Sequence, residues 1–437
     1  MWRLLSWNEG GEQRGMRIAI VGAGISGLVA AYHLADEHEL TVFEANDYIG
    51  GHTNTVPVDD AVGRVYVDTG FIVFNPSNYP NFSALLDVLG VESQPTEMSF
   101  SVRCDRSGLE YNGTNLNTVF AQRRNLLSAR FWRMLRDILR FGREATDVLQ
   151  QSGDSQSVDE FVRERGYGRE FVHNYLLPLG ASLWSCPVGT FSGFPIRFVV
   201  EFLDNHRMLQ VSNRPQWRVV KGGSFCYVEK LAEGFRSSTR LRCPVVHVSR
   251  SADSVTIRDG NGEVSQFDHV VLACHADQAL RMLTDPSPLE AEILESFPYQ
   301  KNEAVLHTDT SVLPRCRRAW ASWNYRRSCD DDNPVAVTYN MNLLQGLRTD
   351  QTYCVTLNDS GRIEPRQILR RFTYHHPMFT ERRAGAQARH RELIDQRRTS
   401  FCGAYWGYGF HEDGVRSALA VCRQLRSALT EARGATQ

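Results

Sequence analysis

The sequence has no surplus of charge of either sign. Its 49 lysine and arginine residues face 50 aspartate and glutamate residues, which gives a formal net charge of −1 at pH 7. Without a basic surplus, the protein as a whole does not attract a polyanion. We therefore expect no nucleic-acid partner.

The sequence also lacks spaced cysteine pairs. Its ten cysteines are scattered along the chain, and no two of them form a C-x-x-C pair. Such pairs are typical of zinc sites and of redox-active thiols, and regular cysteine spacings are typical of disulfide frameworks. We therefore expect no metal site and no disulfides, but reduced thiols in a cytoplasmic protein.

No apolar run is long enough to cross a membrane. The longest apolar stretch, residues 18–35, contains three glycines, whereas a transmembrane helix needs about 20 predominantly apolar residues. Residues 1–15 lack the apolar core of a signal peptide, and we expect them to be a disordered extension.

The most informative segment that is present joins a strand to a helix through glycines. Residues 17–21 form an apolar, β-branched run, as expected of a strand buried on both faces of a parallel sheet. Gly22, Gly24 and Gly27 follow as G-x-G-x-x-G and lead into a helix expected from residue 25 to 35. These glycines permit a tight turn, close approach of a pyrophosphate and close packing of the helix.

A second strand, expected at residues 40–43, ends at Glu44. A carboxylate about 20 residues after the glycines is placed to accept hydrogen bonds from a ribose diol. An acid at this position argues against a 2′-phosphate. The segment therefore predicts a dinucleotide site, and both FAD and NAD remain open at this point.

Four later segments narrow the choice. A glycine pair at residues 50–51 is followed by D-T-G-F at 68–71. A second glycine pair at 222–223 precedes an expected helix, and an expected strand–hairpin–strand unit covers residues 244–274. The segment F-C-G-A-Y at 401–405 and the run E-D-G-V-R-S-A at 412–418 lie near the C-terminus.

In this order, the segments resemble those of the flavin-dependent amine oxidase and phytoene desaturase superfamily. Four short motifs are most similar to those of bacterial predicted NAD/FAD-binding proteins associated with cyclopropane or methylated fatty acid metabolism. They are D-T-G-F-I-V-F-N, L-H-T-D, S-W-N-Y and G-F-H-E-D-G. The resemblance implies FAD rather than NAD. No cysteine has the glycine-flanked context used for covalent attachment, so we expect the FAD to be non-covalent.

The resemblance also implies an α/β fold of two parts. A Rossmann-type FAD-binding domain, as in amine oxidases and glutathione reductase, is expected from the discontinuous segments 16–80, 215–280 and 395–434. A mixed α+β substrate domain is expected from residues 81–214 and 281–394. One predicted helix covers residues 169–177 and ends before Pro178.

The glycine motif and the resemblance together assign the cofactor contacts. They are Gly22, Gly24, Ile25, Ser26, Gly27, Glu44, Ala45, Gly51, His52, Thr53, Thr69, Gly70, Phe71, Ile72, Val246, Ala273, Glu412, Asp413, Gly414 and Val415. A helix that begins near Gly414, with Asp413 as its N-cap, is expected to face the flavin O2. Lys301 falls near the lysine that amine oxidases keep beside flavin N5, and a surface lysine is the alternative.

The function that this resemblance favours is removal of a hydride from a C–H bond of a hydrophobic substrate, by a desaturase or isomerase of a lipid acyl or isoprenoid chain. A flavin amine oxidase is the second hypothesis. Against it, Val415 stands where amine oxidases place a tyrosine of their aromatic cage. A flavoprotein that acts as a binding partner without turnover is the third.

Residues 126–143 predict an amphipathic helix. Leucine, isoleucine, methionine and phenylalanine side chains share one face and five arginines share the other. Such a helix is typical of peripheral contact with an anionic membrane, here the inner face of the cytoplasmic membrane. A helix that packs its apolar face into the core, with a solvated arginine face, is the alternative. The oligomeric state is not indicated.

Overall fold

The computed structural model describes residues 15–150, 156–184, 186–210, 214–327, 336–378 and 380–434. The extension predicted at residues 1–15 lies outside the described residues except for Gly15. In the part of the chain that is described, no helix combines the length and the apolar character needed to cross a membrane.

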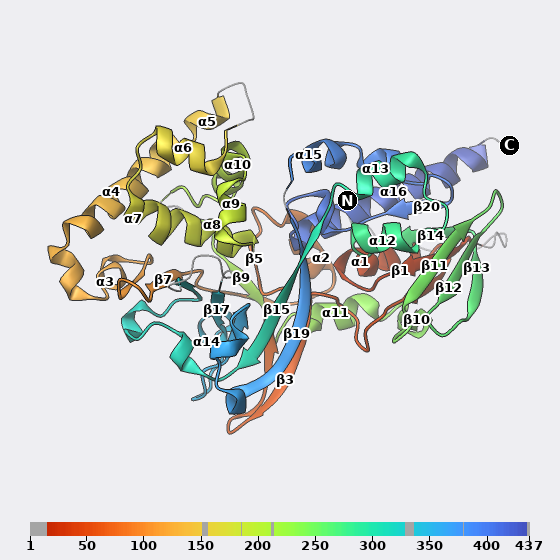
Figure 1. Cartoon of the computed structure of the whole chain (residues 1–437). Coiled ribbons are helices and arrows are strands. Elements are labelled where there is room, and N and C mark those ends of the chain that lie inside the picture. Colours follow the sequence, from red (N-terminus) through yellow and green to blue (C-terminus); the bar gives the residue numbers. More distant parts are fainter. Residues whose placement is uncertain are drawn as a thin grey trace.

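A five-stranded parallel sheet forms one end of the molecule, at the right in Figure 1. Its order is β10 (Thr239–Arg240), β2 (Glu39–Phe43), β1 (Arg17–Val21), β14 (His269–Leu272) and β20 (Thr399–Phe401). Ile18 of β1 pairs with His269 of β14, a partner far along the chain. Parallel neighbours need long connections, so the sheet is assembled from distant segments. The predicted α/β Rossmann-type fold is confirmed.

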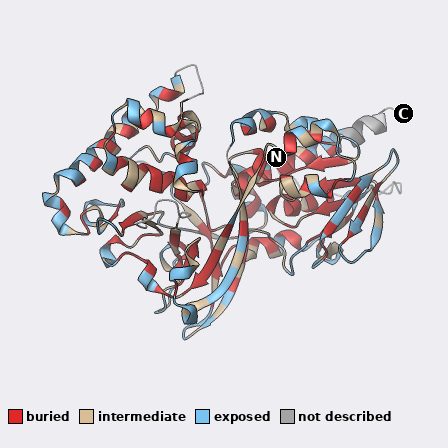
Figure 2. Ribbon diagram, in the orientation of Figure 1, coloured by how far each residue is buried: buried red, intermediate tan, exposed pale blue. Residues whose placement is uncertain are grey.

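Strand β1 is buried on both faces, as its unbroken apolar sequence predicts. Ile18 and Ile20 belong to one core cluster, whereas Ala19 and Val21 belong to another. The first cluster is completed by α1 (Ile25–Leu34), α2 (Pro80–Val88), α11 (Phe225–Ala232) and α16 (His411–Gly434). The second contains β11 (Val245–Arg250), β12 (Val255–Asp259), α12 (Ala276–Met282) and α13 (Pro288–Leu294), with β13 (Val264–Phe267) completing the hairpin sheet. In Figure 2, the strands of the parallel sheet and much of the helices around it carry the colour of buried residues.

A seven-stranded mixed sheet forms the middle of the molecule. Its order is β19 (Ile368–Pro377), β15 (Tyr299–His307), β18 (Cys354–Leu357), β17 (Ala336–Asn340), β16 (Trp323–Arg327), β7 (Phe100–Cys104) and β8 (Leu109–Asn112). Only β16 and β7 pair in parallel. The long strands β15 and β19 run between the parallel sheet and a group of helices at the other end of the molecule (Figure 1).

Two smaller sheets connect these parts. The hairpin of β3 (Thr55–Asp60) and β4 (Gly63–Asp68) projects from one side, and β5 (Val73–Phe74), β9 (Arg218–Val220) and β6 (Ser93–Pro95) form a second small sheet. These two sheets carry the chain from the dinucleotide motif toward the helices. The domain boundaries proposed from the sequence remain predictions.

A second group of helices, separate from those around the parallel sheet, lies at the opposite end of the molecule, at the left in Figure 1. They are α3 (Leu116–Val119), α4 (Ala129–Glu144), α5 (Asp147–Gln150), α6 (Val158–Glu164), α7 (Arg169–Phe171), α8 (Leu177–Trp184), α9 (Val188–Ser192) and α10 (Ile196–Asn205). The prediction that a helix ends before Pro178 is wrong. A π-helical turn at Val172–Leu176 leads directly into α8, where Pro178 is the second residue. Pro178 has no N–H to donate to the carbonyl oxygen of Asn174, four residues earlier, and Tyr111 Oη donates to that oxygen instead, at 2.7 Å.

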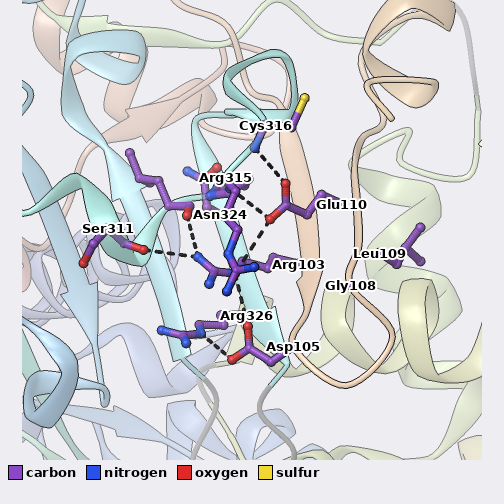
Figure 3. Close-up of polar contacts among 12 residues, drawn as sticks. Arg103, Asp105, Gly108, Leu109, Glu110, Ser311, Arg315, Cys316, Asn324 and Arg326 are labelled. Atoms are coloured by element: carbon purple, nitrogen blue, oxygen red, sulfur yellow. Dashed lines mark hydrogen bonds and ion pairs between the residues drawn. The ribbon is translucent and has the colours of Figure 1, made fainter. Parts of the chain in front are cut away.

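A buried polar network fixes the edge of the seven-stranded sheet (Figure 3). The guanidinium of Arg103 on β7 donates to the carbonyl oxygens of Ser311 and Leu313, at 3.1 and 2.7 Å. It also forms an ion pair with Asp105 at 3.1 Å and lies 3.8 Å from Glu110. The backbone N–H groups of Arg315 and Cys316 donate to the Glu110 carboxylate. The network therefore ties β7 and β8 to the loop after β15.

Candidate functional site

A cavity of about 1260 Å³ lies at the carboxyl ends of the parallel strands. Val21, Phe43, Ala273 and Gly403 line it, and they end or follow β1, β2, β14 and β20. In open α/β sheets this edge is where ligands bind. The volume exceeds the roughly 300–1,000 Å³ of an ordinary small-molecule pocket, which leaves room for a dinucleotide and a second ligand.

The glycines of the first motif shape one wall of this cavity. A Cβ at Gly27 would lie 1.9 Å from the Gly22 carbonyl oxygen, so only glycine lets α1 pack this close to the turn. A Cβ at Gly22, whose φ is +103°, would lie 2.8 Å from the Ala273 carbonyl oxygen. Gly24 differs, because a Cβ there would meet no atom within 4 Å. The space beside Gly24 is therefore a hollow that belongs to the cavity.

The N-termini of two helices meet at this wall. A Cβ at Gly414 in α16 would lie 2.8 Å from Ile25 Cγ2 and 2.9 Å from Ser26 Oγ in α1. Unpaired N–H groups and the positive end of the helix dipole make a helix N-terminus favourable for phosphate. Two such ends side by side favour an anionic group in the adjacent cavity.

The helix that was expected to begin near Gly414 begins at His411. Asp413 is therefore its third residue and not its N-cap. The Asp413 carboxylate reaches back to accept from the Phe410 N–H at 3.0 Å, and it pairs with Arg416 at 3.0 Å. It thus satisfies a donor just ahead of the first turn, from inside the helix.

Glu44 is buried at the edge of the cavity, where the ribose contact was predicted. One carboxylate oxygen accepts from the Ala23 N–H at 2.8 Å, and the other accepts from the Asn46 N–H and side-chain amide at 2.9 Å. These bonds aim the carboxylate along the glycine turn.

A hydrogen-bonded triad joins the three segments that were predicted to form the FAD-binding domain. Tyr227 Oη lies 2.5 Å from Thr53 Oγ1 and 2.7 Å from His411 Nε2, and Thr53 Oγ1 lies 3.1 Å from the same nitrogen. The His411 ring stacks on Phe71 at 3.6 Å. Burial holds the pKa of His411 well below its usual value, so the imidazole is neutral.

Sequence reasoning identified His52 but missed the three histidines that lie beside it in the cavity, His275, His375 and His376. His52, His275, His375 and His376 line it together, and the His52 ring stacks on Tyr374 at 4.9 Å. Burial lowers the pKa of His52 to about 4 and those of His275 and His376 to about 3, so these three are neutral at pH 7. Among the described residues, no group of three or more histidine, cysteine or acidic side chains is arranged to hold a metal.

The tautomer of His376 follows from a chain of amides that begins at a backbone group. The Glu303 N–H donates to Asn358 Oδ1 at 3.0 Å, and because it only donates, it fixes the Asn358 amide. Asn358 Nδ2 then donates to Asn302 Oδ1 at 2.8 Å, and Asn302 Nδ2 donates to His376 Nδ1 at 3.0 Å. His376 therefore carries its proton on Nε2.

These histidines make the stability depend on pH. An unfolded histidine takes up a proton near pH 6.5, whereas folded His376 does so near pH 3. The stability from neutral His376 is thus complete above about pH 6.5 and is lost as the pH falls toward 3. Between about pH 7 and pH 5, we expect the Tm of His376→Gln to fall less than the Tm of the wild type. Thermal unfolding at a series of pH values measures this difference.

The raised pKa values of Asp68 and Asp413, both about 6, act in the opposite direction, but they are common to both proteins and cancel in this comparison. The exposed histidine His247 provides the control, and His247→Gln should melt in parallel with the wild type. Parallel melts for His376→Gln would contradict the prediction.

Comparison with known proteins places the chain in a family. The model of the family described as "Flavin containing amine oxidoreductase" matches residues 25–315, more than half of the chain. The chain belongs to this family. Flavin-containing amine oxidase A of Sus scrofa is 23% identical over 340 residues, which cover 74% of this chain and 61% of that enzyme. The chain thus spans about six tenths of the length of that relative.

Two further similarities lie outside amine oxidation. A 4,4'-diapophytoene desaturase of Staphylococcus aureus (strain Newman) is 47% identical over 45 residues, which cover 10% of this chain and 9% of that one. The crystal structure of a CLA-producing fatty acid isomerase from P. acnes superposes with a TM-score of 0.64 at 17% identity, over 94% of this chain and 99% of that one. This likeness concerns the fold.

The cofactor of this flavin-containing family member is FAD, and the cavity fits it. The hollow at Gly24 admits a pyrophosphate, and the paired helix N-termini favour its charge. His52 Nε2 is buried and has no hydrogen-bond partner among the described residues, as expected of a group that faces a polar ligand.

Most of the predicted cofactor residues line this one cavity. They are Gly22, Gly24, Ile25, Ser26, Glu44, Ala45, Gly51, His52, Thr69, Gly70, Phe71, Ile72, Val246 and Ala273. Six others do not line it, and they support the residues that do. They are Gly27, Thr53, Glu412, Asp413, Gly414 and Val415.

Glu412 shows what such support means. Its carboxylate accepts from the N–H groups of Asn81 and Phe82, at 3.1 and 2.9 Å, and so caps the N-terminus of α2. Lys301 takes no part in the site, because its side chain is exposed on β15 and does not line the cavity. The structure agrees with the alternative given for this residue, a surface lysine.

Proposed function

We propose that this protein is an FAD-dependent oxidoreductase that removes a hydride from a C–H bond of a hydrophobic, chain-like substrate, as a lipid desaturase or isomerase. The observation that carries the proposal is the lining of the cavity beyond the cofactor residues. Aromatic and aliphatic side chains from the mixed sheet and the helices predominate there. They include Met98, Phe100, Leu179, Leu183, Trp184, Phe202, Trp217, Trp323 and Tyr339.

The charge of the lining supports the same proposal. Glu44 is the only acidic residue among the described residues that line the cavity, and it lies beside the glycine turn, where we propose that the ribose binds. An ammonium group at the far end would therefore leave water without gaining a carboxylate partner, which is costly. An apolar chain loses nothing there and gains the hydrophobic contribution of burial.

When bound, FAD supplies the hydride acceptor. The protein excludes water from the reacting bond through its apolar lining, and it orients the chain between the mixed sheet and α8. Neutral His52, His275 and His376 surround the cavity without adding charge, and His376 presents an Nε2–H donor fixed by Asn302.

Anaerobic titration of the flavin-loaded protein tests this function. A desaturase should give a dehydrogenated acyl product together with loss of the visible absorbance of the oxidised flavin. An isomerase should give an isomerised product without lasting bleaching, because the hydride returns to the substrate, and mass analysis of the lipids identifies either product. Bleaching by amines and not by lipids would replace the proposal with amine oxidation. Bleaching by neither, with no altered acyl product, would indicate a flavoprotein without turnover on these substrates.

We further propose that the helical end contacts an anionic membrane. Most of the apolar face predicted for residues 126–143 packs inward, since Phe131 and Met134 are buried, and only part of it is exposed. The exposed apolar side chains at this end form the outer apolar edge. This edge consists of Leu116, Leu126, Leu127, Trp132 and Leu139.

The charge around the outer apolar edge indicates the kind of partner that it binds. Residues 123–143 hold seven arginines and one acid, Asp137, which is buried. Apolar side chains beside a cluster of arginines are typical of a surface that inserts between anionic headgroups.

Vesicle sedimentation tests the membrane contact. Vesicles that contain phosphatidylglycerol should sediment the wild type, and Leu126→Glu with Leu127→Glu should weaken binding by about tenfold or more, because two apolar insertions are lost. Val264→Glu, which changes an exposed valine on β13 at the other end, should bind as the wild type does. Equal sedimentation of the wild type and the double variant would refute the contact.

A further inference from the structure

A second hollow lies beside α4, behind the far end of the main cavity. Its volume is about 420 Å³. Most of its lining is apolar and comes from α4, α10 and the segment after α10. The lining residues are Ile138, Leu139, Phe141, Gly142, Arg143, Tyr175, Leu179, Leu203, Met208, Leu209, Gln210 and Arg214. We call it the side pocket.

The side pocket and the main cavity meet at shared side chains. Tyr175, Leu179, Met208 and Arg214 line both. The wall between the two hollows is therefore one side chain thick at these residues. Met208 is unbranched and flexible, and Arg214 is exposed, so neither closes the wall rigidly.

Two exposed arginines give the side pocket a positive charge. Arg143 and Arg214 are both exposed, and their Nε atoms donate to the carbonyl oxygens of Leu139 and Gln210, at 3.2 and 2.8 Å. Among the described residues, neither guanidinium lies within 4.0 Å of a carboxylate. Their terminal nitrogens therefore remain available to a carboxylate or phosphate, which guanidinium binds in bidentate fashion.

We propose that the side pocket binds the headgroup end of a single-chain anionic lipid, whose acyl chain passes Leu179 and Met208 into the main cavity. The inference rests on the proposed function and narrows its substrate class. It selects chains that end in a carboxylate or phosphate over neutral isoprenoids. An apolar hollow that carries two exposed arginines, one of them in the wall shared with the cavity, matches both the charged and the apolar end of this amphiphile.

Titration of the flavin-loaded protein with a fluorescent polyene fatty acid tests the side pocket without turnover. The probe is used as a monomer, in buffer without vesicles. Reversing both charges, with Arg143→Glu and Arg214→Glu, should weaken its binding by more than about tenfold, since one charge-assisted hydrogen bond is worth about that much. The methyl ester of the same probe should bind both proteins equally, because it has no charge to lose.

Filling the hollow provides a second measurement that does not depend on charge. Leu139→Trp adds bulk to a half-exposed side chain of the side pocket and should also weaken binding of the free acid. Leu127→Trp is the matched control, since Leu127 is 94% exposed and lies outside the pocket. It should bind the probe as the wild type does.

The outcomes separate this inference from the proposed function. Probe binding that depends on the arginines, with neither bleaching by lipids nor an altered acyl product, supports the side pocket and overturns the proposed function. Bleaching by fatty acids with the same KM in the wild type and the double arginine variant overturns the side pocket and leaves the function standing. Binding of the acid only when anionic vesicles are added, with the wild type and variant alike in plain buffer, also overturns it.

Discussion

Replacing Gly24 by leucine is expected to yield a folded protein that no longer retains FAD. A Cβ at this position meets no protein atom within 4 Å, so the fold tolerates the side chain. The same side chain occupies the hollow that admits the pyrophosphate. Overpacking costs about 1–3 kcal/mol, which corresponds to roughly 5- to 150-fold weaker binding. Flavin absorbance per protein after purification, and reconstitution titrations, measure the loss.

Gly189→Leu is the matched control for this change. A Cβ at Gly189 also meets nothing within 4 Å, but Gly189 lies in α9 and outside the cavity. It should retain FAD as the wild type does. Full flavin content in Gly24→Leu would remove Gly24 from the cofactor site.

Replacing Arg103 by alanine is expected to destabilise the protein by about 3–5 kcal/mol, because it breaks a buried ion pair and leaves two carbonyl oxygens unpaired. Arg103 is 7% exposed and bonds Asp105, Ser311 and Leu313 (Figure 3). The midpoint and slope of urea unfolding measure the change. The loss should also lower flavin retention, since Phe100 on the same strand lines the cavity.

Arg362→Ala is a control on the same network. Arg362 reaches Asp105 at 3.7 Å, but its side chain is 45% exposed, and exposed pairs contribute about 0–1 kcal/mol. Its unfolding midpoint should stay close to that of the wild type. Equal destabilisation by the two changes would mean that burial does not set the strength of this network.

The part of the site that lies within one short segment was predictable from the sequence. The glycines of the first motif and Glu44 act through local geometry, in which a strand, a turn and a helix follow one another. Their spacing therefore indicated both the element order and the wall of the cavity. The family resemblance, and not local geometry, indicated Val246, which lies in β11, and Ala273, which follows β14.

The part that depends on tertiary pairing was not predictable. His375 and His376 reach the cavity because β19 pairs with β15, and no local pattern indicates that pairing. Lys301 lies on the same ladder, where it pairs with His375, but its side chain is exposed. Helix α16 begins three residues earlier than predicted, because the Asp413 carboxylate accepts from the Phe410 N–H, which precedes the helix. A sequence pattern does not distinguish such a residue within the first turn from an ordinary N-cap.

The assembly of the parallel sheet from distant segments has a consequence for how the chain folds. One edge of β1 pairs only with β14, where Ile18 lies opposite His269. The sheet is complete only when β20, near residue 400, pairs with β14. Contacts of such sequence separation form slowly, because long loops must close first. During synthesis, β1 can pair early with β2, but its other edge stays unpaired until β14 emerges, and such an apolar strand edge is prone to aggregation.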